Sequence, residues 1–391
     1  MFGAPKHFPG GGAVADLDWL AGLRVIEVTT GVAAPLTGRI LAELGADVIK
    51  VESRAKLDVN RVRVPNAATA GIADEETLRL EGFGLLHEAS ASKRSIRLDL
   101  KNPRGKDLFL RLLDTADAFV QNFAPGWLER LGLSVGGLLD RNPRLIVVSA
   151  TGYGQEGPLS SQRAYAPIMS SLAGIEGLIG YEDGDVVGAS ATALADLNCS
   201  FYGAYLALAA LHGRTETGGG RHLDLSQTEA CAALVGEAMI EYARAGKSPG
   251  PVGNATPRGD REVVPSADGG WVVIEGLAKD SDEYRDLLAA GRPREDLVSS
   301  LRARGIRATP VLSPDEVVAD EGFRERGMFQ QVEHPVLGPL TTSSIPWHLD
   351  GAVPRVRSSS PLFGHDTAAV MAELGLSPAE IATLETDKVL Y

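Results

Sequence analysis

The chain has 391 residues, of which 44% are hydrophobic and 23% are charged, and its formal net charge is -13. This length is sufficient for two domains or one large domain with a substantial core, and the acidic balance argues against nucleic acid as a partner. The two cysteines and seven histidines show neither a disulfide framework nor a metal-ligand spacing, so we predict no metal site. We also see no signal peptide and expect no membrane-spanning segment, which predicts a cytoplasmic protein that does not bind membranes.

The first elements form a β-α-β unit. Residues 23–30 and 47–53 have the pattern of strands, and residues 34–46 between them have helical spacing of apolar residues. Such a unit indicates a parallel sheet. The turn "TGVAAPLTG" after the first strand lacks the G-x-G-x-x-G pattern, which disfavours a dinucleotide site with Glu52 on the ribose.

The alternation of strands and helices continues along the chain. Strands are predicted at 95–101, 117–123 and 144–154, with a helix at 104–116, a helix at 202–211, and a strand followed by a long helix at 218–244. Residues 246–270 are rich in Gly, Pro and charge and are predicted to be a loop or linker. A strand at 271–276 begins a smaller unit that extends to about 330, and two short helices end the chain, the second beginning after Ser377.

Five stretches of the chain resemble one protein family. They are "GLRVIEVTTGVAAPLTGRILAELGADVIKVE", "SKRSIRLDLKNPRGKDLFLRLL", "DAFVQNFAPGWLERLGL", "RLIVVSATGYGQEGP" and "HPVLGPL". This pattern is similar to that of the class III CoA-transferases of the CaiB/BaiF type, which include formyl-CoA transferase and carnitine CoA-transferase. The α-methylacyl-CoA racemases share much of it. The similarity extends from about residue 20 to residue 385.

The resemblance implies an α/β fold with a Rossmann-like large domain and a smaller α+β domain. It also implies a homodimer whose two chains are interlocked like links. On this basis we expect a large CoA-binding domain at 1–217, a linker helix and small domain at 218–330, and a segment at 331–391 that returns to the large domain.

Asp196 stands just before an apolar helix, in "ALADLNCS". One interpretation is a helix N-cap, for which Asp is well suited. In the transferases that this chain resembles, however, an Asp at this place is the catalytic nucleophile. It attacks the thioester carbonyl of an acyl-CoA, forming an aspartyl anhydride and then an aspartyl-CoA thioester. We expect the positive end of the helix to favour the ionised carboxylate.

Tyr165 distinguishes between the related activities. The racemases that resemble this chain carry a His at this place, and a tyrosine with an ordinary pKa of about 10 is a poor base near neutral pH. Formyl-CoA transferase-like proteins carry Tyr followed by Glu, but Ala166 follows here. We therefore favour CoA transfer from an acyl-CoA donor to a carboxylic acid acceptor, with Tyr165 as a candidate catalytic residue. An acyl-CoA racemase or isomerase is the alternative, and a buried structural role for Tyr165 also stays open.

The resemblance also implies the residues that bind CoA, which would be a substrate and not a permanently bound cofactor. The residues carried over are Leu98, Leu100, Lys101, Asn122, Phe123, Arg130, Arg163, Arg54 and Val32. The basic side chains among them would meet phosphates, and Phe123 would pack near the pantetheine or the adenine.

Two departures from the family pattern are visible. Val32 stands where the family often has a Gln near the reacting carbonyl, and no tetraglycine-like loop follows "VGNATPRG". The sequence "SADGGW" at 266–271 is instead predicted to form a hairpin turn. The changes at Val32 and Ala166 leave a catalytically inactive CoA-binding homologue as a third possibility.

Overall fold

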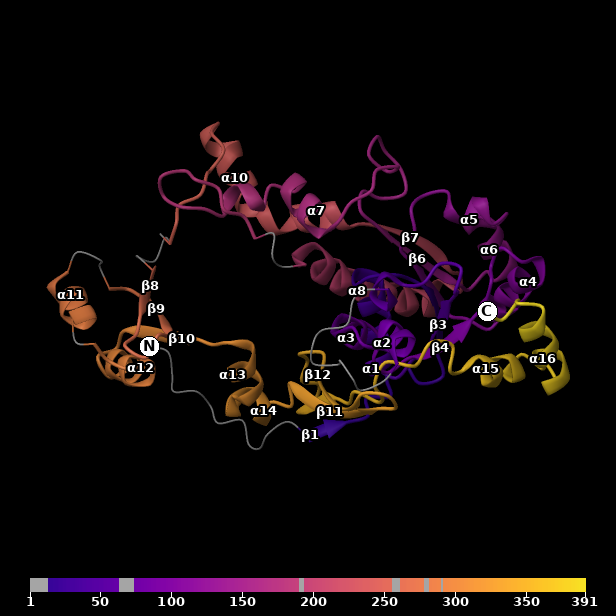
Figure 1. Cartoon of the computed structure of the whole chain (residues 1–391). Helices are drawn as coiled ribbons and strands as arrows, with labels where there is room; N and C mark the ends of the chain where they lie inside the picture. Colours follow the sequence, from indigo (N-terminus) through magenta and orange to yellow (C-terminus); the bar gives the residue numbers. More distant parts are fainter. Residues whose placement is uncertain (1–12, 63–73, 190–192, 255–260, 278–280, 290) are drawn as a thin grey trace. The chain divides into compact units, whose positions relative to one another are not determined.

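The computed structural model describes residues 13–62, 74–189, 193–254, 261–277, 281–289 and 291–391. The chain divides into two compact units, whose elements are labelled in Figure 1. Unit 1 consists of Met1–Ala173, Ala191–Leu234 and Arg324–Tyr391, and unit 2 consists of Gly174–Ser190 and Val235–Phe323.

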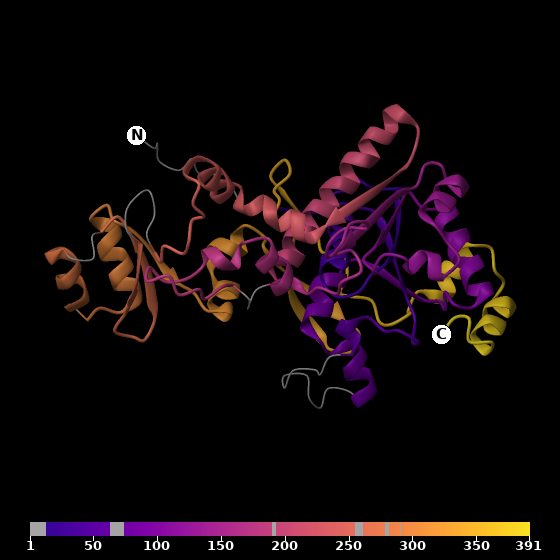
Figure 2. The ribbon, with the colours of Figure 1, turned by 90° about the horizontal axis from the view of Figure 1, so that it is seen from above.

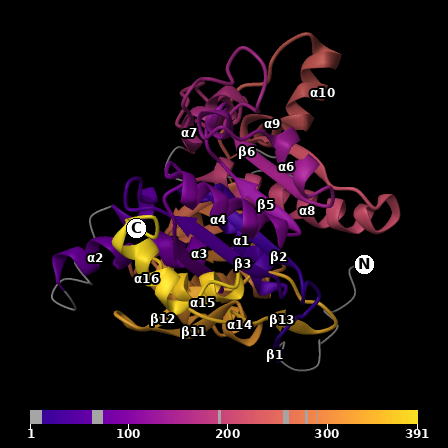
Figure 3. The same ribbon diagram turned by 90° about the vertical axis from the view of Figure 1, so that its right-hand side faces the viewer.

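A six-stranded parallel sheet forms the centre of unit 1, with the order β4-β3-β2-β5-β6-β7 (Figure 3). Its strands are β2 (Arg24–Val28), β3 (Asp47–Glu52), β4 (Arg94–Arg97), β5 (Ala118–Gln121), β6 (Ile146–Thr151) and β7 (Arg221–Ser226). The predicted strands and their parallel pairing are confirmed. Strands that are covered on both faces read as continuous apolar runs, and every residue of β5 and β6 is buried.

Successive side chains of the strands enter two different cores, as the pleat requires. Val25 belongs to the core that contains residues of α1 (Ala33–Glu43) and α8 (Leu194–Thr217). The next residue, Ile26, belongs to the core formed with five other helices. These are α4 (Pro103–Asp114), α5 (Trp127–Arg130), α6 (Val135–Arg141), α15 (Thr367–Glu373) and α16 (Pro378–Thr386). The C-terminal helices α15 and α16, yellow in Figure 1, thus pack into unit 1, and Ser377 caps α16 as predicted.

The remaining elements of unit 1 are short. A parallel pair joins β1 to β13, and β11 and β12 form an antiparallel hairpin. The bounds are β1 (Ala13–Ala15), η1 (Val59–Arg61), α2 (Glu75–Glu81), α3 (Gly84–Ser90), α7 (Ala166–Leu172), α9 (Gln227–Ala232), β11 (Phe329–His334), β12 (Gly338–Ser343) and β13 (Ala352–Pro354).

Unit 2 contains a three-stranded antiparallel sheet with the order β10-β9-β8 (Figure 2). Its strands and helices are η3 (Glu176–Leu178), α10 (Gly236–Ala245), β8 (Arg261–Pro265), β9 (Trp271–Glu275), α11 (Asp282–Ala289), α12 (Arg294–Ala303), β10 (Arg307–Val311) and α13 (Pro314–Ala319). Two short helices, η4 (Ala233–Val235) and α14 (Glu321–Glu325), lie at the unit boundaries.

The hairpin turn predicted in unit 2 is confirmed. Pro265 pairs with Trp271 across it, and Gly269 adopts a φ of +82°, which a side chain would disfavour. The prediction of a loop at 246–270 is wrong in part, because Arg261–Pro265 form β8 by pairing with β9. Residues 255–260, next to which the sequence predicts no tetraglycine-like loop, lie outside the described residues.

The division into units differs from the predicted boundaries at two places. Residues 218–234 belong to unit 1 and not to the second part, because β7 pairs along its whole length with β6. Residues 174–190 belong to unit 2, although they lie within the predicted large domain.

One described helix, α8, is long and apolar enough to cross a membrane, which the sequence analysis did not anticipate. Its small residues, such as Cys199, Ala204 and Ala207, are fully buried in the core that it shares with α1. Core helices of this kind pass the same test, so length and composition alone do not indicate a span here.

Buried charged side chains form ion pairs at the carboxyl end of β3, where Glu52 is the last residue. The Arg61 guanidinium is buried and lies 2.8 Å from Glu52 and 2.9 Å from Glu81. Ser95 Oγ also donates a hydrogen bond to Glu52. Burial acts to lower the pKa of Arg61, but the two carboxylates prevail and raise it, so the guanidinium stays charged.

We predict that Arg61→Met lowers the free energy of unfolding by about 3–5 kcal/mol, because it leaves two buried carboxylates without a partner. The matched control is Arg141→Met, which removes an exposed pair with Asp114 and is expected to cost less than about 1 kcal/mol. Urea unfolding of both variants measures the difference. Equal midpoints for the two variants would contradict the prediction.

Candidate functional site

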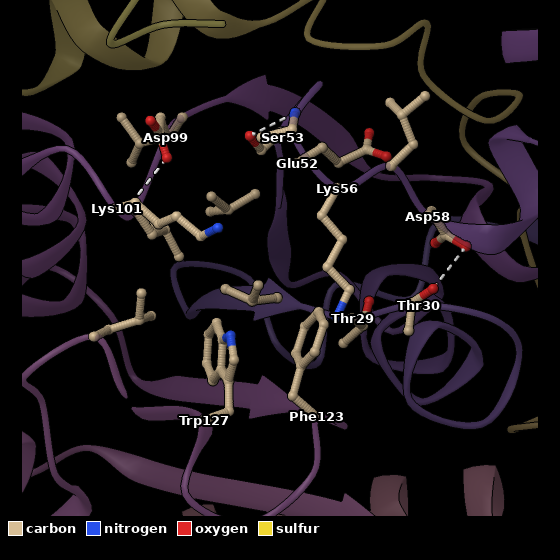
Figure 4. Close-up of a pocket in the computed structure, with 17 residues that line it drawn as sticks. Thr29, Thr30, Glu52, Ser53, Lys56, Asp58, Asp99, Lys101, Phe123 and Trp127 are labelled. Carbon is tan, nitrogen blue, oxygen red and sulfur yellow. Dashed lines mark hydrogen bonds between the residues drawn. The ribbon is translucent and has the colours of Figure 1, made fainter. Parts of the chain in front are cut away.

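A cavity of about 230 Å³ opens at the carboxyl edge of the parallel sheet (Figure 4). It is lined by residues at and after the ends of β2, β3, β4 and β5. The strand order reverses here, because the chain runs from β2 outward through β3 to β4 and then returns to the other side of β2 with β5. Open parallel sheets bind ligands at such switch points.

Apolar and aromatic side chains form one wall of the cavity. Phe123 and Trp127 stack with ring centroids 4.7 Å apart and an interplanar angle of 19°. Leu98 and Leu100, at the end of β4, add aliphatic surface. The wall therefore offers a flat ligand an apolar slot.

Basic side chains gather at the same cavity. Lys56 extends toward Phe123, with Nζ 4.5 Å from the ring centroid, and Lys101 lines the cavity after β4 (Figure 4). The pKa of Lys56 is lowered by its partial burial and by the positive charges of Arg130, Arg163 and Lys101. None of these four cations forms an ion pair with a carboxylate of the described residues. Such an uncompensated cluster attracts an anion.

The turn between β2 and α1 forms part of the cavity edge and is held from two sides. The side-chain amide of Asn122 donates to Thr30 O (2.8 Å) and accepts from Thr30 N (2.9 Å). The Asp58 carboxylate accepts from Gly31 N at 3.0 Å and from Thr30 Oγ1 at 3.3 Å. Asp58 in turn lies 2.9 Å from the buried ammonium of Lys50. Burial acts to raise the pKa of Asp58, but Lys50 and the backbone donors prevail and lower it, so the carboxylate stays ionised.

Asp196 lies in the first turn of α8. The N-cap position is Ala193 and no side chain caps the helix, so the N-cap interpretation of Asp196 is wrong. Its carboxylate forms no hydrogen bond or ion pair with the described residues. Burial raises its pKa to about 6, which overrides the lowering expected from the helix terminus. The group is still about nine-tenths ionised at pH 7.

The structure places the predicted site residues in different surroundings. Leu98, Leu100, Lys101 and Phe123 line the cavity together. Arg130 and Arg163 do not line it, but their charges act on Lys56.

Four other predicted residues lie elsewhere. Asn122 positions the turn and does not line the cavity. Arg54 pairs with Glu76 at 2.9 Å, and Ser53 lines the cavity in its place. Val32 lines a second, apolar cavity. Tyr165 is 71% exposed, so the expectation of a buried aromatic is wrong for this chain alone.

Sequence analysis missed Lys56 and Trp127. Trp127 stands four residues after Phe123 in "NFAPGW", but Pro125 and Gly126 lie between them and α5 begins only at Trp127, so helical spacing gives no signal for the stacking of the two rings. Lys56 lies on an irregular loop after β3, and no periodicity identifies it. Among the described residues, no group of three or more His, Cys, Asp and Glu side chains could hold a metal ion.

Comparison with known proteins identifies the family. The profile described as CoA-transferase family III matches residues 20–289 and 285–367. The chain is 31% identical to the succinate–glutarate CoA-transferase of Agrobacterium fabrum, over 91% of this chain and 95% of that protein. It is 28% identical to a formyl-CoA:oxalate CoA-transferase of Escherichia coli, over 95% and 99% respectively.

A solved structure agrees with these matches. The CaiB/BaiF family protein from Brucella suis has a TM-score of 0.77 and 29% identity, and the match covers 91% of this chain and 99% of that chain. It therefore supports the mixed α/β fold with a parallel central sheet. The chain belongs to CoA-transferase family III.

Proposed function

We propose that this protein transfers CoA from an acyl-CoA donor to a carboxylic acid acceptor, with Asp196 as the covalent nucleophile. The observation that carries the proposal is the Asp196 carboxylate, partly buried at the start of α8 without any cation beside it among the described residues. A carboxylate kept unpaired in this way is costly, and such groups concentrate at functional sites. The names of the two transferase relatives support the reaction class.

CoA would occupy the cavity at the carboxyl edge of the sheet. Its adenine suits the slot beside Phe123 and Trp127, and its phosphates suit the uncompensated cations around Lys56. A phosphate contacting these groups would form charge-assisted hydrogen bonds. The pantetheine would then follow the rigid turn after β2 toward α8.

The proposed chemistry alternates between two covalent states. The Asp196 carboxylate attacks the thioester carbonyl, and the C–S bond breaks to release CoA thiolate and leave a mixed anhydride. The thiolate attacks the aspartyl carbonyl, which releases the donor acid as a carboxylate and leaves an aspartyl-CoA thioester. An acceptor carboxylate reverses both steps and leaves with CoA. The first N–H groups of α8 lack intrahelical acceptors and are suited to stabilise the oxyanions.

A homodimer is part of this proposal. The helix α7 exposes Ile168 and Leu172, and Tyr165 precedes it with 71% of its surface exposed. Helix α8 packs against α7 and exposes Tyr205. Large apolar side chains gathered in this way are typical of an association surface, and a second copy covering them would also bring Tyr165 out of solvent.

We predict that Asp196→Asn abolishes CoA transfer, because an amide cannot form the anhydride. Hydroxylamine added to the wild-type protein with an acyl-CoA should leave a hydroxamate on residue 196, detectable by peptide mass spectrometry. The Asn variant should show neither activity nor label. A variant that keeps transfer activity would contradict the proposal. Exchange of the acyl-CoA α-hydrogen for solvent deuterium, without an acceptor, would instead favour the racemase alternative.

The same substitution separates a catalytic from a structural role. Because the folded protein raises the pKa of Asp196 from 3.8 to about 6, it binds this proton more tightly than the unfolded chain does. The ionised group therefore destabilises the fold above pH 6, and this cost disappears as the pH falls below 4. We predict that Asp196→Asn is more stable than wild type by about 1–3 kcal/mol at pH 7.5 and about equal to it at pH 3.5. Thermal or urea unfolding at both pH values checks this, and a less stable variant at pH 7.5 would indicate a structural role.

The rate of transfer should follow the ionisation of Asp196. We predict that kcat/KM rises with pH, reaches half its maximum near pH 6 and is flat above pH 7, because only the carboxylate attacks. The control is CoA binding measured by calorimetry over the same range for wild type and Asp196→Asn: the 3'-phosphate of CoA itself titrates at about pH 6, so the two binding profiles should coincide. A rate that stays constant down to pH 5 would contradict the assignment.

The cation cluster predicts the behaviour of CoA binding. We expect Lys56→Gln and Lys101→Gln each to raise the Kd of CoA about tenfold, because each removes a charge-assisted contact with phosphate. Arg104→Gln is the matched control, since that guanidinium pairs with Asp387 on the surface, 2.6 Å away. Calorimetry at fixed ionic strength measures all three. If the lysine variants bind CoA as tightly as the Arg104→Gln control, the CoA phosphates do not bind at this cluster.

A further inference from the structure

A second cavity, of about 360 Å³, lies in unit 1 between α1, α3, α8 and the residues around β12. Figure 1 labels these elements. Its surface is almost entirely apolar. The side chains that define it are Val32, Leu36, Leu85, Leu197, Phe201 and Ile345.

The two charged residues on its wall are already paired with each other and with the backbone. Arg39 donates to Glu43 at 2.6 Å, to Glu88 at 3.1 Å and to Ser343 O. The Glu88 carboxylate also accepts hydrogen bonds from Thr342 and Ser343. No charge on the described wall therefore remains to meet a carboxylate of a ligand.

Two residues that line the cavity lie next to the proposed active site along the chain. Val32 is the N-cap residue of α1 and follows Gly31, in the same turn whose Thr30 lines the CoA cavity. Leu197 follows Asp196 in the first turn of α8. The two helices are fixed to each other by the hydrogen bond from Thr37 Oγ1 to Ser200 O, 3.1 Å long.

We propose that this cavity, defined by Val32, Leu197 and Phe201, binds the acyl chain of the CoA thioester and selects aliphatic monocarboxylic acyl groups over dicarboxylic ones. The inference rests on the proposed function for its placement of CoA and of the thioester. A second carboxylate buried in this cavity would lose its hydration without gaining a cation. An aliphatic chain would instead leave water for an apolar surface, and each buried methylene would improve affinity about fourfold.

Binding to the Asp196→Asn variant tests the inference without turnover. Calorimetry would compare CoA, acetyl-CoA, hexanoyl-CoA and succinyl-CoA. We expect hexanoyl-CoA to bind at least tenfold more tightly than acetyl-CoA, and succinyl-CoA to bind no more tightly than CoA. Equal affinities for hexanoyl-CoA and acetyl-CoA, or a preference for succinyl-CoA, would overturn the inference. If the wild-type protein shows no transferase activity but still prefers hexanoyl-CoA, the proposed transfer function is wrong and the acyl-binding inference holds.

Matched variants on α8 place the effect in the cavity. Phe201 and its neighbour Tyr202 are similarly exposed, at 39% and 38%. Only Phe201 lines the cavity. Introduced into the Asn variant, Phe201→Ala should abolish most of the hexanoyl preference while leaving CoA affinity unchanged. Tyr202→Ala should leave the preference intact. If both substitutions reduce the preference for hexanoyl-CoA, or if neither does, the acyl chain binds elsewhere and its assignment to this cavity is wrong.

Discussion

The buried ion pair between Lys50 and Asp58 is the constraint on which the site depends. Lys50 lies on β3 and is fully buried, so its charge is tolerable only because Asp58 and Glu27 compensate it. The carboxylate of Asp58 then fixes the backbone of Gly31 and the side chain of Thr30. This turn borders the proposed CoA cavity at Thr29 and Thr30 and the apolar cavity at Val32. A change in the pair would therefore move both binding regions together.

Asp196 stands out against the other buried carboxylates. Every fully buried acidic side chain among the described residues has a cationic partner: Glu27, Glu43, Glu52, Asp58 and Glu81. Asp196 has none, and burial alone raises its pKa. A cation beside it would stabilise the fold but would also weaken the carboxylate as a nucleophile. Stability and reactivity thus conflict at this one residue, which is the pattern expected where the sequence serves chemistry.

Sequence reasoning predicted the sheet well because short strands rich in valine and isoleucine, such as β2, β3 and β6, alternate with segments of helical spacing. Phe123 and Lys101 were identified through the resemblance to the family, and both line the cavity. Lys56 was missed because its position depends on an irregular loop, and the role assigned to Arg54 failed because a shift of one residue places Ser53 at the cavity. The assignment of residues 174–190 to unit 2 cannot be predicted from local sequence, because only contacts distant in sequence determine it.

Under the proposals made above, the two cavities would divide recognition between chemically different surfaces. The proposed CoA cavity offers cations and stacked rings, which suit the part that all CoA esters share. The apolar cavity has its charged residues consumed by internal pairs, so shape and hydrophobic area determine what it accepts. Hydrophobic selection is graded, at about a fourfold change per methylene, whereas an unpaired buried charge rejects a ligand sharply. A site built this way discriminates strongly against charged acyl groups and only weakly among aliphatic chains of neighbouring length. Substitution of a single wall residue such as Val32 by a polar side chain would therefore shift the class of acid that is accepted, while the CoA half stays unchanged.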